Sequence, residues 1–156
     1  MQYLTDELLS DLEKYLLAVS APAQPQILFQ LADISELSLD EIAKSKPETF
    51  RDKLFDMIKG KGLDEVEIYK RGNVSRQLFS RIRSEPDYHP TKSTVFSLAI
   101  GMGLNIAETA ELLEIAGYAF SPANKADLII QYFIHHQNYN IFAVNEALVK
   151  YGFPPL

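Results

Sequence analysis

The sequence predicts an all-α protein. Helix-starting patterns recur along its 156 residues, in which a Ser, Asp or Asn is followed three residues later by a Glu. Such side chains can pair with the free backbone amides of a first helical turn. These capping patterns begin at Ser38, Ser45, Asp64 and Asn105. Strand patterns are missing, because no alternating run of Val, Ile or Thr is bounded by an Asn-Gly or Asp-Gly turn.

The first helix is expected at residues 6–19. Five of its residues form an apolar stripe at helical spacing, namely Leu8, Leu9, Leu12, Tyr15 and Leu16. The helix should end before the Pro-containing stretch 21–25, which indicates a turn or a short linker.

The other helices follow from the same caps and stops. They are expected at residues 26–32, 39–44 and 47–59, as four helices within 64–116, and as a final pair at 122–136 and 141–151. Pro47 and Pro122 suit the first position of a helix, where the missing N–H costs nothing. We therefore divide the chain into an acidic N-terminal helical arm (1–46), a central domain (47–118) and a C-terminal helical extension (119–156).

Charge is distributed unevenly along the chain. The formal net charge is −6, and residues 1–48 alone hold nine acids against three lysines. Residues 70–92 reverse this balance with six basic residues against Glu85 and Asp87. The basic residues are Lys70, Arg71, Arg76, Arg81, Arg83 and Lys92. A basic island in an acidic protein is a candidate contact for phosphate groups.

A motif runs through the central domain from Asp64 onward. Its parts are the cap Asp64, the triplets Glu67-Ile68-Tyr69 and Asn73-Val74-Ser75, then Phe79-Ser80, Ile82, Pro90-Thr91, Thr94-Val95 and the run from Leu98 to Asn105. This pattern resembles the Cro/repressor (lambda-repressor-like) helix-turn-helix family over about residues 50–117. The resemblance implies a five-helix domain of that type with helical additions at both ends, as in small bacterial or phage regulators.

The same residues have a direct physical interpretation. Asn73 stands where a helix has to end in a left-handed conformation, and Ser75 can cap the next helix. At 100° per residue, the polar side chains of that next helix share one face, and Leu78, Phe79 and Ile82 share the opposite one. The polar face consists of Arg76, Gln77, Ser80 and Arg81. We therefore expect one buried face and one exposed face.

The family resemblance implies a sequence-specific DNA-binding transcriptional regulator whose second motif helix enters the major groove of double-stranded DNA. By position, Arg76, Gln77, Ser80 and Arg81 would read bases, since Arg can bond bidentately to guanine and Gln to adenine. Lys70, Arg71, Ser75, Arg83 and Lys92 would contact phosphates. Such regulators generally bind as dimers, and the apolar run 129–134 with Ile141 and Phe142 is the expected homodimer surface.

The alternative hypothesis is a protein-interaction module, such as an antitoxin-like adaptor that keeps the helix-turn-helix fold without specific DNA binding. The acidic N-terminal arm would then contact a protein partner. The apolar C-terminal extension also supports this alternative. Asp64 and Glu65 weaken the DNA-binding hypothesis, because two carboxylates at the start of the motif's first helix repel phosphate.

Other classes of function lack their residues. The chain has no cysteine for a disulfide or a thiolate metal site. His135 and His136 point about 100° apart on a helix and cannot chelate one metal together, and His89 stands alone. No Gly-rich phosphate loop or nucleophile with a base partner is recognisable. We expect no catalytic site, metal or cofactor, and a soluble cytoplasmic protein without signal peptide or membrane span.

Overall fold

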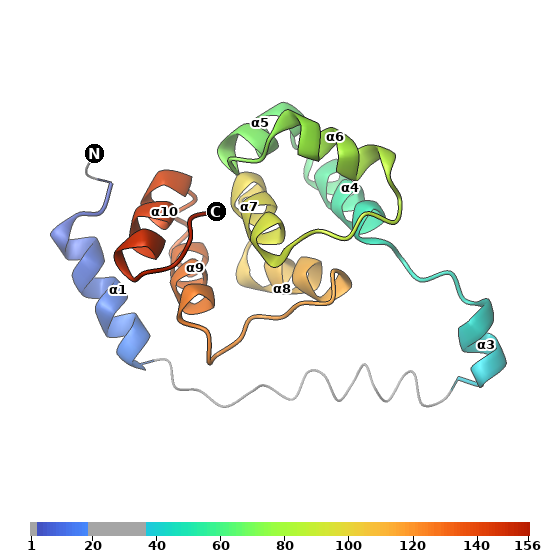
Figure 1. The fold of residues 1–156 in the computed structure, drawn as a ribbon, viewed down its shortest axis with the longest axis horizontal. Helices are drawn as coiled ribbons and strands as arrows, with labels where there is room; N and C mark the ends of the chain where they lie inside the picture. Colours follow the sequence, from blue (N-terminus) through green and yellow to red (C-terminus); the bar gives the residue numbers. More distant parts are fainter. Residues whose placement is uncertain (1–2, 19–36) are drawn as a thin grey trace.

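The structure, a computed structural model, describes residues 3–18 and 37–156. Within those ranges all regular structure is helical, as predicted (Figure 1). The helices are α1 (Asp6–Ala18), α3 (Leu39–Lys44), α4 (Phe50–Lys61), α5 (Glu65–Arg71), α6 (Arg76–Ser84), α7 (Lys92–Met102), α8 (Ile106–Ile115), α9 (Lys125–His135) and α10 (Ile141–Lys150). The helix expected at 26–32 lies outside the described residues. No described helix is long and apolar enough to cross a membrane.

Two of the four expected capping boxes are present. Ser38 with Glu41 starts α3, and Asn105 with Glu108 starts α8, each with both reciprocal hydrogen bonds. Asp64 caps α5 by accepting from the Val66 amide at 3.4 Å. The box there is incomplete, because the Glu67 carboxylate pairs with Arg71.

The prediction that Ser45 and Pro47 start a helix is wrong. Ser45 instead ends α3, where its N–H donates to the Glu41 and Ile42 carbonyls. Thr49 caps α4 by accepting from the Asp52 amide at 3.2 Å. Two capping residues lie four positions apart, and the one nearer the buried Phe50 sets the helix start.

Pro122 likewise lies outside the helix that it was expected to begin. It falls in the turn before α9, which Asn124 caps. The Asn124 side chain accepts from the Ala126 amide at 2.9 Å and from the Asp127 amide at 3.4 Å. One oxygen satisfying two free amides fixes the start of α9 three residues later than predicted.

Helix α7 forms the centre of the core. Every residue from Val95 to Met102 is buried, so this helix is enclosed on all sides. It packs against α5, α8 and α10 (Figure 1). Helix α5 and the following α6 lie at the edge of the molecule, away from α1 (Figure 1).

Helix α1 packs against the C-terminal helices. Leu12 is fully buried, and the Tyr15 ring meets the Tyr132 ring of α9 edge-on at 5.3 Å between centroids. The Glu146 carboxylate of α10 accepts the backbone amides of Tyr3 and Leu4, each at 3.1 Å. Helix α1 and the C-terminal extension, which the sequence predicts as separate additions, therefore share one core (Figure 1).

This packing uses the residues expected to form a homodimer. Within the apolar run of the extension, six side chains are buried inside the chain: Ile129, Ile130, Tyr132, Phe133, Ile134 and Ile141. Phe142 is 58% exposed and stacks on Tyr3. Most of the expected dimer surface is thus occupied by the chain's own core.

Two glycines allow α5 and α7 to approach closely. A Cβ atom at Gly101 of α7 would lie 2.3 Å from the Ile68 carbonyl oxygen of α5, and one at Gly72 would lie 2.3 Å from the Ser97 carbonyl oxygen. Both neighbours are backbone atoms, so neither can rotate away. The direction of α5, and of the turn that starts at Gly72, depends on the absence of these two side chains.

This contact predicts opposite effects for two glycine-to-alanine substitutions. Gly101→Ala should lower the free energy of unfolding by about 1–3 kcal/mol, because α5 must move off α7. Gly60→Ala in α4 is the control, since a Cβ there meets nothing within 4 Å. It should stabilise the protein by about 1 kcal/mol through helix propensity. Urea denaturation measures both, and stabilisation by Gly101→Ala would contradict the close approach.

Candidate nucleic-acid interface

The turn between α5 and α6 has the expected backbone conformation. Asn73 adopts φ 56°, in the left-handed region. Val74 is buried, and its amide donates to the Tyr69 carbonyl at 2.8 Å. The Ser75 hydroxyl caps α6 by accepting from the Leu78 amide at 3.1 Å. These bonds fix the point and the direction in which α6 begins.

Helix α6 has one buried and one exposed face, as predicted. Phe79 and Ile82 are 2% and 0% exposed, and Leu78 is partly buried against the same core. The four side chains expected to read bases, Arg76, Gln77, Ser80 and Arg81, are all exposed and line one shallow surface hollow together with Ser84. The structure therefore brings these four residues together on a surface open to solvent.

Aromatic rings attach the buried face of α6 to its neighbours. The Phe79 ring lies 5.6 Å from the Tyr69 ring of α5 and 5.9 Å from the Phe55 ring of α4, measured between centroids. The Tyr69 ring thus fills space beside Phe79. Such ring pairs contribute about 0.5–1.5 kcal/mol each beyond their buried area.

Arg81 is held at the C-terminal end of α6. Its Nε donates to both carboxylate oxygens of Glu85, each at 3.2 Å. Its guanidinium also lies over the Tyr88 ring, 5.1 Å from the centroid. The pair is more than half exposed, so it contributes little to stability and can exchange partners cheaply.

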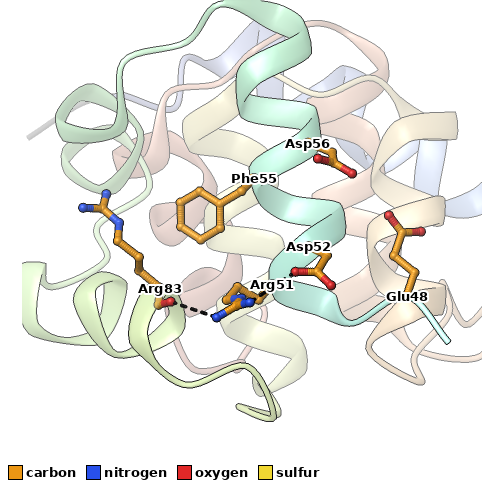
Figure 2. Close-up of a pocket in the computed structure, with 6 residues that line it drawn as sticks. All are labelled: Glu48, Arg51, Asp52, Phe55, Asp56 and Arg83. Atoms are coloured by element: carbon orange, nitrogen blue, oxygen red, sulfur yellow. Dashed lines mark hydrogen bonds and ion pairs between the residues drawn. The ribbon is translucent and has the colours of Figure 1, made fainter. Parts of the chain in front are cut away.

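Arg83 contacts the two neighbouring helices α4 and α5. Its guanidinium pairs with Glu65 at the start of α5 and lies 5.7 Å from the centroids of the Phe55 and Phe79 rings. The Arg83 carbonyl accepts from Arg51 of α4 at 3.4 Å. Figure 2 shows the Phe55 ring directed toward Arg83. A second surface hollow lies beside Arg83, and Arg51, Phe55 and three carboxylates also line it, those of Glu48, Asp52 and Asp56. Asp52 lies 3.5 Å from Arg51, so this side of α6 borders a surface of mixed charge.

The remaining basic residues of the motif differ in their partners. Arg71 pairs with Glu67 one turn earlier at 3.4 Å, and both side chains are mostly exposed. Lys70 and Arg76 are exposed and pair with no carboxylate in the described ranges. Two cations near the turn are thus unneutralised, whereas three arginines have acidic partners.

Lys92 forms an ion pair with the buried Asp127. Its ammonium lies 2.5 Å from an Asp127 carboxylate oxygen that also accepts the Ser121 amide at 2.8 Å. Asp127 is 2% exposed, and the Lys92 ammonium lies 5.8 Å from the Phe96 centroid. The bond joins the start of α7 to the first turn of α9. Lys92 therefore serves helix packing in this structure.

Some of these partners could have been recognised in the sequence. Glu67 precedes Arg71 by four residues and Glu85 follows Arg81 by four, which is the spacing of helical ion pairs. The Glu65–Arg83 and Lys92–Asp127 pairs join different helices, so no local pattern indicates them.

In the described part of the chain, no three His, Asp or Glu side chains are grouped so that they could hold a metal ion. His89 and His136 are bonded to the carbonyls of Ala116 and Tyr132, each at 2.8 Å.

Comparison with known proteins gives no relative, since the chain matches no protein-family model, no curated protein and no solved structure.

The role of Lys92 predicts a stability difference between two lysines. Lys92→Met should lower the free energy of unfolding by about 3 kcal/mol, because it leaves the buried Asp127 carboxylate without its cation. The control Lys70→Met removes an exposed, unpaired charge and should change stability by no more than about 0.5 kcal/mol. Denaturant unfolding of both variants tests this, and equal stabilities would show that the ion pair is not important for packing.

Proposed function

We propose that this chain is a sequence-specific DNA-binding transcriptional regulator with a Cro/repressor-type helix-turn-helix, in which α6 enters the major groove of double-stranded DNA. One observation carries the proposal. Arg76, Gln77, Ser80 and Arg81 lie together on the exposed face of a capped helix whose other face is buried. A helix presented in this way has the width and the donor groups for base edges.

Arg76 and Gln77 are the strongest candidates for base contacts. They occupy the first turn of α6, the part that enters the groove in this docking mode. An Arg can donate two hydrogen bonds to guanine, and a Gln amide can form two with adenine, accepting from its N6 amino group and donating to N7. Ser80 lies one turn further along the helix. Arg81 could also contact a base once its hydrogen bonds to Glu85 break.

The proposed phosphate contacts surround the turn. Lys70, Arg71, Ser75 and Arg83 are the candidates, and they would hold the register of α6 without reading sequence. We leave Lys92 out of this set because its ammonium is bonded to buried Asp127. Lys70 is the most available of them, being exposed and unpaired within the described residues.

The adaptor remains the second candidate because of a specific observation. Glu67, Glu85 and Glu65 already pair with Arg71, Arg81 and Arg83. A surface on which three of four arginines are paired with carboxylates attracts phosphate weakly. It could instead bind a protein through the same exposed side chains.

We also propose a homodimer through the C-terminal extension, with a smaller contact surface than the sequence predicts. The exposed apolar side chains left there are Phe142 and Val149, which are 58% and 59% exposed, together with Tyr3 stacked on Phe142. Two copies would be needed to bind both halves of a pseudo-palindromic site. Light scattering gives the oligomeric state, and a monomer in the presence of DNA would remove the dimer from the proposal.

Selection from a random duplex library at two salt concentrations tests the proposal directly. A sequence-specific regulator enriches one motif at both concentrations, more sharply at the higher one, where non-specific binding weakens. Enrichment of no motif at either concentration would favour the adaptor.

Substitutions on α6 and near the turn should separate two kinds of contact. Arg76→Ala should cost about 1–3 kcal/mol for the selected site and relax selection at the base pairs it contacts. Lys70→Ala should weaken binding to every sequence and reduce the magnitude of the salt slope by about 0.9. Fluorescence anisotropy titrations measure both, with Lys150→Ala on α10 as the control for a lost positive charge. An equal loss in all three variants would mean that charge alone is recognised.

Removing the acidic partners of Arg83 and Arg81 should strengthen binding to DNA. Glu65→Gln and Glu85→Gln free the Arg83 and Arg81 guanidinium groups, so each should tighten binding to random duplex DNA and steepen the salt slope by about 0.9. Glu114→Gln on α8 is the matched control, an exposed glutamate without an ion pair in the described ranges. Affinity that rises no more than in this control would show that these arginines do not reach phosphate.

A further inference from the structure

The backbone of Leu156 connects the last helix to the turn that precedes α6. The Asn145 side chain of α10 forms a reciprocal pair with it: Oδ1 accepts the Leu156 amide at 2.7 Å, and Nδ2 donates to the Leu156 backbone oxygen at 3.2 Å. The Asn73 Nδ2 donates to the same oxygen at 3.3 Å. One backbone oxygen is thus shared by two amides from distant parts of the chain.

The location of Asn73 gives this bridge its importance. Asn73 is the left-handed residue of the α5–α6 turn, so its orientation sets the direction in which α6 leaves. Its side chain is exposed apart from this contact. Leu156 and Asn145 are both partly buried, and Leu156 packs against the core. The bridge therefore joins an exposed turn to a fixed part of the fold.

We propose that Asn145 and the Leu156 backbone are a clamp that positions the α5–α6 turn, and through it α6. Asn145 is a positioning residue, because it acts on α6 only through Leu156 and Asn73. The part of this proposal that concerns DNA rests on the proposed function, whereas the positioning itself does not. Releasing the clamp should widen the range of α6 orientations and lower specific affinity more than non-specific affinity.

The absence of native cysteines allows a direct measurement of α6 orientation. Ser80→Cys on α6 and Ala107→Cys on α8 introduce two exposed sites for nitroxide spin labels in the full chain. Pulsed electron paramagnetic resonance then gives the distribution of distances between the labels. We expect Asn145→Ala to broaden this distribution, and Lys150→Ala, an exposed change on the same helix, to leave it unchanged.

A second variant keeps the test valid if Asn145→Ala folds poorly. Asn73→Asp retains the side-chain shape and the tolerance for positive φ, but it replaces the donating amide by an acceptor that cannot bond the Leu156 oxygen. It should broaden the label distances in the same way while the melting temperature stays close to that of the parent. Unchanged distances in both variants would overturn the clamp.

DNA binding provides a separate readout. If the chain selects a DNA motif, Asn145→Ala should reduce affinity for that motif by roughly 2- to 30-fold, the usual size of an indirect coupling, with little change for random duplex. Equal losses on both DNAs would overturn the functional part of the clamp. If the parent chain selects no DNA, the proposed function fails, and broadened label distances still support the clamp as a device that positions α6.

Discussion

The contact between α5 and α7 is the constraint on which the candidate interface depends. Gly72 and Gly101 let the two backbones approach where any side chain would collide with a carbonyl oxygen. Because Gly72 is also the first residue of the turn, this contact fixes where α6 starts. Asn73 and Ser75 then set its direction, and Phe79 anchors its buried face. The exposed polar face of α6 is a consequence of these backbone and packing constraints.

Electrostatics on this surface is more balanced than the sequence indicates. The basic island of residues 70–92 stands out along the chain, yet in the folded protein Arg81 and Arg83 meet Glu85 and Glu65. Every side chain in these pairs is at least 37% exposed, so each pair contributes about 0–1 kcal/mol and can be replaced by a pair with phosphate. The acids therefore weaken general attraction to nucleic acid. Recognition would then depend more on the unpaired Arg76 and on Gln77.

Local features of the fold could be predicted from the sequence, because they depend on residues close together in the chain. The limits of α3, the left-handed Asn73 and the two faces of α6 are examples. Long-range partners could not be predicted, since Lys92 with Asp127 and α1 with α9 meet only in the folded chain. Competition between caps was also unpredictable, as at Ser45 and Thr49. Whether α6 binds DNA stays a prediction.

An ¹⁵N-labelled chain titrated with a short duplex of its selected sequence, or of random sequence if none is selected, tests the central claim most directly. Chemical-shift changes show which backbone amides lie near the DNA. Our account predicts that the largest changes fall between residues 70 and 84, with saturation at a defined ratio of chain to duplex. Changes confined to other helices, or no change at low salt, would contradict the assignment of α6 as a DNA-binding helix.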